Sequence, residues 1–256
     1  MIISKSQKFA FIKGRKVAGT SVEVGLSSLC TDDDILTPIS PIDELLRLQT
    51  TGRFAQNYGA DAKKLKRYRT TLLASDNTDN LNWSDIRKPR GRYGGHMSFK
   101  DMEQTFGGFS PDWTIIAITR CPYEQALSRI KHSANKGAVQ QRSGQSLDPS
   151  SDLFQQAKER FFQRASEQSI RTNISLYKDA KKQLRPSFYL RYERLNDDYE
   201  ILMHKLGATT FAALPHLKQT KTATRAKPDD LFQANEIKII NACFAEEFER
   251  FGYAQL

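Results

Sequence analysis

The chain has 256 residues, of which 39% are hydrophobic, and it carries a net charge of +10. This length suits one large α/β domain, and the hydrophobic fraction excludes a chain that is disordered throughout. The three cysteines form no C-x-x-C pair, which argues against a disulfide framework or a zinc site. No apolar run approaches the roughly 20 residues of a membrane-spanning helix, and the first eight residues are too polar for a secretory signal. We therefore expect a cytoplasmic protein without a membrane span, and the positive charge suggests an anionic partner.

The predicted elements alternate between strands and helices. Residues 8–13 predict a short buried strand, 14–19 a glycine loop and 20–29 a helix with one apolar face. Further strands are expected at 113–119 and 186–191, and further helices near 42–49, 60–67, 98–106, from 122 onward, 152–167, 169–183, 195–206 and 237–251. No linker or repeat interrupts this order. We therefore expect a single domain over residues 1–256, a three-layer α/β fold whose mostly parallel central sheet is flanked by helices.

The glycine loop reads G-R-K-V-A-G-T-S over residues 14–21 and resembles a phosphate-binding loop without matching it. The nucleoside-triphosphate pattern places a lysine directly after the second glycine, where this chain has Thr20. Lys16 lies four residues earlier, and no apolar strand ends in an acidic residue suited to Mg²⁺, which weakens a kinase or ATPase reading. A glycine loop, a helix N-terminus and the hydroxyls of Thr20 and Ser21 can nevertheless hold a phosphate. The structural alternative is an ordinary tight turn.

Five segments carry a resemblance to sulfotransferases that use 3′-phosphoadenosine 5′-phosphosulfate (PAPS). Residues 9–23, FAFIKGRKVAGTSVE, resemble the opening motif F-I-x-x-P-K-[TC]-A-G-T-S of bacterial and carbohydrate members, with departures at Arg15 and Val17. Arg120-Cys-Pro-Tyr-Glu-Gln-Ala-Leu-Ser128 matches the R-x-P-x-x-x-x-x-S motif, and Gly95-His96-Met-Ser-Phe99 matches G-H-x-x-F. Tyr192-Glu193-Arg-Leu195 and the terminal Phe251-Gly-Tyr253 are also similar to family segments.

The resemblance implies a P-loop NTPase-like fold and transfer of a sulfuryl group from PAPS to an acceptor hydroxyl, or less favourably an amine. The acceptor would be a carbohydrate or another small metabolite, with neither a metal nor nucleic acid involved. Lys16 would be the catalytic electrophile and His96 the catalytic base, with Asp101 or Glu103 as substitutes for the histidine. The implied cofactor-binding residues are Arg15, Lys16, Ala18, Gly19, Thr20, Ser21, Arg120, Ser128, Lys221 and Arg225.

Other functions remain open at the level of sequence. A P-loop-type kinase with a degenerate loop is one, and a non-catalytic binder of nucleic acid or of an acidic polymer is another. A catalytically inactive sulfotransferase-like domain is a third, although it would not need Lys16, Arg120 and His96 together. The basic clusters at 63–69 and 87–92 hint at an acidic acceptor, or else form solvated faces.

Overall fold

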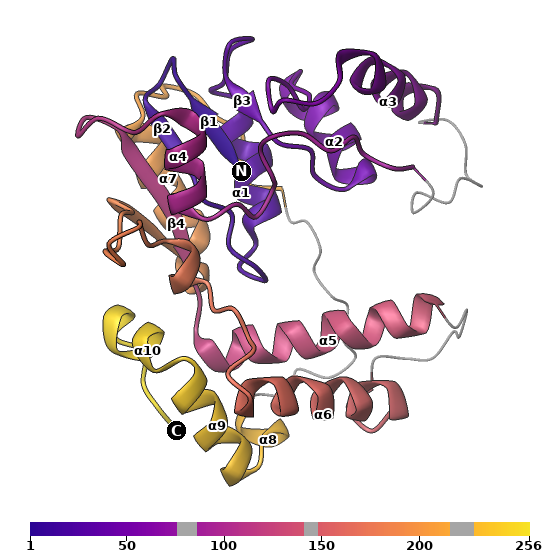
Figure 1. The fold of residues 1–256 in the computed structure, drawn as a ribbon, viewed down its shortest axis with the longest axis vertical. Coiled ribbons are helices and arrows are strands. Elements are labelled where there is room, and N and C mark those ends of the chain that lie inside the picture. Colours follow the sequence, from indigo (N-terminus) through magenta and orange to yellow (C-terminus); the bar gives the residue numbers. More distant parts are fainter. Residues whose placement is uncertain (76–85, 141–147, 216–227) are drawn as a thin grey trace. The chain divides into compact units, whose positions relative to one another are not determined.

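The computed structural model describes residues 1–75, 86–140, 148–215 and 228–256 (Figure 1). The chain divides into two compact units. The first unit comprises Met1–Ile118 and Leu176–Leu217, and the second comprises Thr119–Ser175 and Lys218–Leu256. Each unit is built from two separate stretches of chain, so no linker in the sequence marks the division. The single domain expected over residues 1–256 stays a prediction.

The first unit contains a five-stranded sheet in the order β3-β1-β2-β4-β5. Strand β2 (Phe9–Phe11) runs parallel to β4 (Thr114–Thr119), whereas β1 (Ile2–Ser4) is antiparallel to both β2 and β3 (Ile35–Leu36). Strand β5 (Phe188–Arg191) forms the other edge. The sheet is therefore mixed, which corrects the expected mostly parallel arrangement. The missed strands are β1 and β3, and the three residues of β1 form a hairpin with β2 across the polar residues 5–8.

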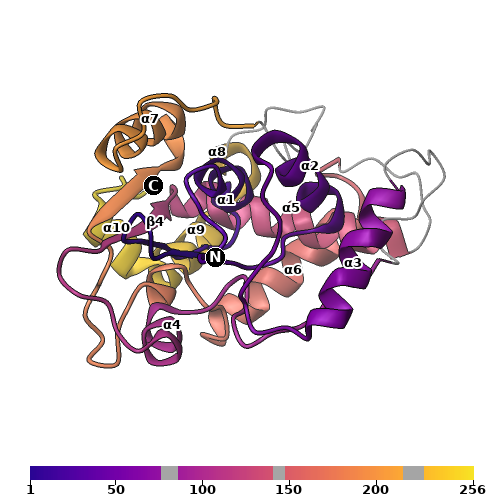
Figure 2. The ribbon, with the colours of Figure 1, turned by 90° about the horizontal axis from the view of Figure 1, so that it is seen from above.

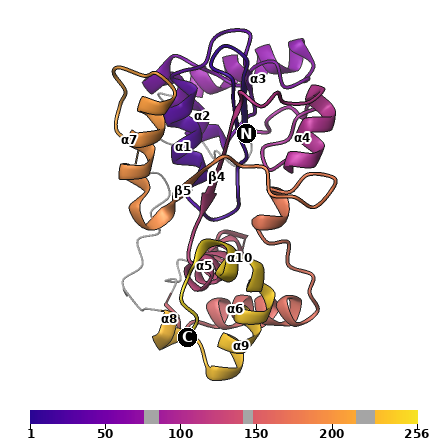
Figure 3. The same cartoon turned by 90° about the vertical axis from the view of Figure 1, so that its left-hand side faces the viewer.

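Helices cover both faces of this sheet, which confirms the expected layers. Along β4, Ile116 and Ile118 belong to a core shared with α1 (Gly19–Ser27) and α7 (Leu195–Lys205). The alternate residues Ile115 and Ala117 belong to a core shared with α3 (Ala62–Ser75) and α4 (Phe99–Phe106). Figure 3 shows α1 and α7 on one side of β4 and α4 on the other. Helix α2 (Pro41–Thr51) packs against α1 and α3.

The second unit is helical. Helix α5 (Pro122–Gln140) packs against α6 (Asp152–Ser166) and α9 (Ala234–Cys243), and α8 (Pro228–Leu231) and α10 (Ala245–Phe251) complete the unit. Its core is rich in phenylalanine, and Phe154, Phe244 and Phe248 are almost fully buried. The single C-terminal helix expected from the sequence is interrupted at Phe244, which adopts a non-helical backbone conformation between α9 and α10.

The helix expected over residues 169–183 is wrong. This stretch holds one 3₁₀ turn, Ile174–Leu176, and an isolated bridge between Lys178 and Leu184. The Asp179 carboxylate accepts hydrogen bonds from the backbone N–H groups of Lys181 and Gln183, at 2.8 and 2.9 Å. Such local side-chain bonds compete with the hydrogen bonds of a helix and favour a turn.

The cysteines and the apolar helices can also be compared with the sequence expectations. The three cysteines are free thiols, as expected, and Cys30 is buried. Within the described stretches, no helix combines the length and the apolar character required to cross a membrane.

Candidate functional site

The glycine loop connects β2 to α1, as the sequence predicts. The N–H of Ile12 donates to the Ile116 carbonyl at 2.9 Å, so the pairing with β4 continues one residue beyond β2. The chain then turns, and α1 begins at Gly19. Val17, in the middle of the loop, is fully buried in the core that α1 and α7 share. This apolar anchor holds the loop against the sheet.

The loop backbone is strained at two residues. Lys16 has a φ of +61° and Ala18 a φ of +59°, both in the left-handed region, whereas Val17 between them does not. A non-glycine residue in this region costs about 1–2 kcal/mol. Alternation of backbone handedness points successive N–H groups toward one side, which creates an anion-binding concavity. Strain of this kind accumulates at functional sites, so we interpret the loop as a candidate anion site at the N-terminus of α1.

A buried charge cluster lies behind the loop. The Lys13 ammonium lies 2.6 Å from Oε2 of Glu23 on α1, and the Met1 amino group lies 2.6 Å from Oε1. Burial by itself would raise the pKa of Glu23, but Lys13, the Met1 amino group and Arg47 hold it well below its usual range. A Cβ on Gly19 would lie 2.9 Å from Cγ of Lys13, so a larger residue there would force Lys13 or the loop to shift. The cluster therefore joins the end of β2 to α1.

Lys13 and Glu23 were not predicted as site residues. One feature of the sequence could have indicated this pair. Glu23 is a carboxylate between two valines, in a segment that is expected to form a helix with one apolar face. In the structure eight of the nine residues of α1 are buried, including Glu23. A carboxylate in such a helix requires a buried cation.

The structure brings His96 to the loop. His96 lies in a turn before α4, in which the Met97 N–H donates to the Gly94 carbonyl at 3.2 Å. Its Nδ1 lies 2.9 Å from the backbone carbonyl oxygen of Lys13. Because a carbonyl oxygen only accepts, Nδ1 carries the proton and Nε2 keeps a lone pair. This is the tautomer that a general base requires.

The surroundings of His96 favour the neutral imidazole. Part of the residue is open to solvent, but the protein atoms around the ring limit its hydration, and this desolvation lowers the pKa of His96 to about 4. The cations of Lys13, Met1 and Arg15 act in the same direction, whereas the bond to the Lys13 carbonyl opposes it. At neutral pH Nε2 is therefore available as an acceptor.

The acids considered as substitutes for His96 lie on α4. Asp101 accepts a hydrogen bond from the Ser98 hydroxyl at 2.5 Å, and its N–H donates to that hydroxyl at 3.3 Å. Ser98 is the N-cap residue of α4, so Asp101 has a structural role at the helix start. Glu103 lies two residues further along the same helix and is half-buried.

A second candidate anion site lies at the start of α5, in the second unit. Arg120 precedes the helix, and its guanidinium lies 3.2 Å from Oε2 of Glu124. Glu124, Ser128 and Lys131 follow at intervals of four and three residues, which places them on one side of α5. The Arg120 side chain thus extends one turn along the helix toward Ser128. Lys131 was not predicted, although its spacing from Ser128 could have indicated it.

Lys131 is influenced by both charges of that pair. Burial lowers the pKa of Lys131, Glu124 opposes the shift, and Arg120 adds to it. The side of α5 that contains Ser128 therefore holds two cations and one carboxylate. An anion with two negative charges could replace Glu124 as the partner of Arg120.

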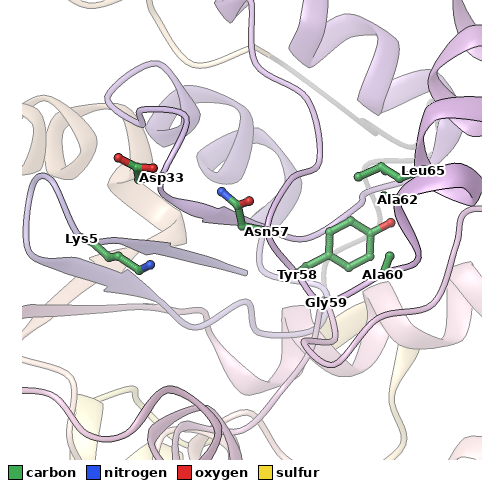
Figure 4. Close-up of a pocket in the computed structure, with 8 residues that line it drawn as sticks. All are labelled: Lys5, Asp33, Asn57, Tyr58, Gly59, Ala60, Ala62 and Leu65. Atoms are coloured by element: carbon green, nitrogen blue, oxygen red, sulfur yellow. The ribbon is translucent and has the colours of Figure 1, made fainter.

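The predicted residues fall into three groups. Arg15 to Ser21 and His96 belong to the first unit, and Arg120 and Ser128 belong to the second. Lys221 and Arg225 lie outside the described residues. A hollow of about 480 Å³ in the first unit is lined by other residues, among them Lys5, Asp33 and Tyr58, and includes none of the predicted ones (Figure 4). Comparisons with protein-family models, curated proteins and solved structures found no match for this chain.

Proposed function

We propose that this chain is a PAPS-dependent sulfotransferase that acts on a hydroxyl of a carbohydrate or another small metabolite. The supporting observation is the hydrogen bond between Nδ1 of His96 and the carbonyl of Lys13, at 2.9 Å. It joins two motifs that lie 83 residues apart and that were identified separately. A general base beside a phosphate-binding loop suits group transfer from a phosphorylated donor to a hydroxyl.

The loop is assigned to the donor. PAPS supplies an activated sulfuryl group attached to a phosphate leaving group. The N–H groups between Lys16 and Gly19, with the hydroxyls of Thr20 and Ser21, would hold the 5′-phosphate at the N-terminus of α1. The Lys16 ammonium would neutralise negative charge as it develops on the leaving oxygen.

His96 is assigned to the acceptor. Nε2 would accept the hydroxyl proton as the oxygen attacks sulfur, and the Lys13 carbonyl would then stabilise the imidazolium through Nδ1–H. An imidazole with a pKa of about 4 is always deprotonated at neutral pH but is a weak base. An anionic donor in the loop would raise that pKa, because it offsets the nearby cations.

The 3′-phosphate is assigned to Arg120 and Ser128, and we add Lys131 to them. The planar guanidinium of Arg120 can donate two parallel hydrogen bonds to a phosphate. The 3′-phosphate would exchange with Glu124 as the partner of Arg120. This pair of cations would distinguish PAPS from a nucleotide without the 3′-phosphate.

Two substitutions test the assignment. Lys16→Ala should lower turnover at least about 100-fold because it removes charge stabilisation in the transition state, while much of the nucleotide affinity remains. Arg120→Ala should instead weaken binding of 3′-phosphoadenosine 5′-phosphate about tenfold or more, measured by calorimetry. Lys100→Ala, on the exposed face of α4, is the control. Wild-type turnover in both site variants would overturn the proposal, and ATP consumption that EDTA abolishes would indicate the kinase instead.

A further inference from the structure

Positive charge is concentrated in one short part of the first unit. Residues 61–92 contain nine cations and four carboxylates, so this eighth of the chain carries half of its net charge of +10. Every one of the nine cationic residues is exposed. We call these nine the basic surface: Lys63, Lys64, Lys66, Arg67, Arg69, Arg87, Lys88, Arg90 and Arg92.

Five of these cations cover the solvent side of α3. Leu65, Tyr68 and Leu72 face the core and recur at intervals of three and four residues. Lys66, Arg67 and Arg69 lie between these positions together with two threonines, and Lys63 and Lys64 precede them. The solvent side of the helix therefore carries five cations and no carboxylate. Helix α3 lies beside α2 in two views of the structure, and its contacts agree (Figures 1 and 2).

The charge of α3 acts against the stability of the helix. Lys63 is three residues from Lys66 and four from Arg67, and like charges at these spacings repel each other. Lys63 and Lys64 also lie in the first turn, where the helix dipole disfavours cations. The helix contains no acidic residue, and Asp61 before it caps the backbone N–H of Lys64 at 2.9 Å. The five cations of α3 therefore destabilise the helix that carries them. This suggests that an anionic ligand supplies the negative charge that the helix itself lacks.

Two of the other four cations, Arg90 and Arg92, lie near the start of α3, whereas the Lys88 ammonium donates to the Pro38 carbonyl at 3.1 Å. The Tyr93 N–H donates to the Tyr58 carbonyl at 2.9 Å, which ties the segment after the second cluster to the residues before α3. A Cβ on Gly91 would lie 2.5 Å from that carbonyl, and a Cβ on Gly59 would lie 2.6 Å from Cβ of Arg92. The two backbones are thus in contact where both have glycine. Arg90 and Arg92 consequently lie next to the residues that lead into α3.

The aromatic residues of this region indicate which kind of anion fits. Proteins that bind single-stranded nucleic acid stack the bases on exposed aromatic rings. Here Tyr58, Tyr68 and Tyr93 are only 1%, 4% and 9% exposed, and all three belong to the core. The described part of the basic surface therefore offers charge without an aromatic platform for bases. That combination suits a polymer whose anionic groups are displayed along a saturated chain.

We propose that the basic surface binds an acidic polysaccharide, that is, a glycan chain with carboxylate or sulfate groups. Binding itself does not depend on catalysis. The further step, that this polysaccharide is the acceptor of the transferase, rests on the proposed function. Under it, the basic surface holds the chain while a hydroxyl of one sugar reaches His96.

The test compares two triple variants of equal net charge. Lys63→Gln/Lys66→Gln/Arg67→Gln removes three charges from α3, and Lys181→Gln/Lys182→Gln/Lys205→Gln removes three exposed charges elsewhere in the first unit. Affinity is measured for a heparin-type oligosaccharide, an oligo-uronate, a neutral dextran, a DNA oligonucleotide and anionic phospholipid vesicles. The α3 variant should lose about tenfold or more affinity for both acidic glycans, and the control variant should lose threefold at most. Dextran should not bind, and the acidic glycans should bind more tightly than DNA or vesicles.

A second readout separates a binding role from a structural one. Because like charges repel within α3, its triple variant should melt about 1–3 °C higher than the wild type even as it loses the glycan. Equal losses in the two variants, or a preference for DNA or vesicles over both glycans, would overturn the inference. The proposed function is tested separately, since binding of 3′-phosphoadenosine 5′-phosphate should be unchanged in the α3 variant. Wild-type protein that binds the bisphosphate but neither acidic glycan would overturn this inference alone, and wild-type protein that binds the glycans but not the bisphosphate would overturn the proposed function alone.

Discussion

Ala18 is the residue at which the free-energy cost of the left-handed backbone conformation in the loop can be measured most directly. Its φ of +59° is easy for glycine and unfavourable for alanine. Ala18→Gly should therefore stabilise the protein by up to about 1 kcal/mol, because relief of strain exceeds the added flexibility of the unfolded chain. Chemical denaturation measures the change. Gln156→Gly, at an exposed position in the interior of α6, is the control and should destabilise by roughly 0.5–1 kcal/mol. A similar loss in both variants would contradict the strained geometry of the loop.

His96 allows a prediction about protonation. With no ligand, the imidazole should titrate near pH 4, as desolvation and the neighbouring cations require. Binding of 3′-phosphoadenosine 5′-phosphate in the loop should raise the pKa, because the phosphate offsets Lys13 and Arg15. NMR titration of the ring protons, with His96→Gln used to assign the resonance, measures both states. Adenosine, which carries no phosphate, is the control and should leave the pKa of His96 unchanged. If 3′-phosphoadenosine 5′-phosphate also left this pKa unchanged, the nucleotide would bind away from His96.

At the scale of elements, the close packing of the start of α1 against Lys13 at the end of β2 depends on Gly19. Gly19→Ala would place a Cβ 2.9 Å from Cγ of Lys13, whose ammonium is held by the buried Glu23. Because Lys13 cannot move freely, we expect a loss of about 1–3 kcal/mol in the free energy of unfolding. Gly94→Ala is the control, since a Cβ there has no neighbour within 4 Å. Equal stabilities for the two variants would show that Lys13 is not fixed.

Elements with a clear apolar pattern were predictable from sequence. β2, α1, β4 and α7 lie within a few residues of their expected positions, because alternation or helical spacing places their side chains in the core. β1 and β3 were missed because three and two residues are too few to show a pattern. The helix expected over 169–183 failed because the turn around Asp179 depends on side-chain bonds that periodicity does not register.

The candidate site was predictable in part for the same reason. The loop and His96 have local sequence patterns, and the structure places them in contact. Lys13 and Glu23 can be recognised as site residues only through their ion pair, which forms when the end of β2 packs against α1. Lys131 is one of many helix lysines until the positions of Arg120 and Glu124 are known. Tertiary contacts of this kind cannot be derived from one sequence.

At the scale of the whole molecule, the two units should respond differently to acid. In the first unit the folded pKa of Glu23 lies below its unfolded value of 4.5, so its contribution to stability is present above pH 4.5 and is lost as the pH falls through the folded pKa. The pKa of His96 is also lowered, from 6.5 to about 4. Between these values only the unfolded chain binds the proton, so stability falls as the pH is lowered from 6.5 to 4.

The second unit has a buried carboxylate with the opposite shift. Glu247 on α10 is 3% exposed, and burial raises its pKa although it accepts hydrogen bonds from the Ile174 N–H and the Gln125 amide. Between the unfolded value of 4.5 and the raised folded pKa, only the folded chain keeps the proton. The contribution of Glu247 to stability therefore increases as the pH falls through that interval.

Hydrogen exchange at pH 7 and at pH 4.5, corrected for the intrinsic exchange rates, should resolve this difference. Amides in β2, α1 and β4 should lose protection, because the His96 contribution falls within this interval whereas Glu23 still contributes at pH 4.5. Amides in α5 and α10 should keep or gain protection. Glu247→Gln is the matched variant, because its neutral amide has nearly the same shape and cannot titrate. It should remove the gain of the second unit and leave the loss of the first unchanged. If α5 and α10 lost protection before α1 did, the buried groups that we name would not control the stability of their units.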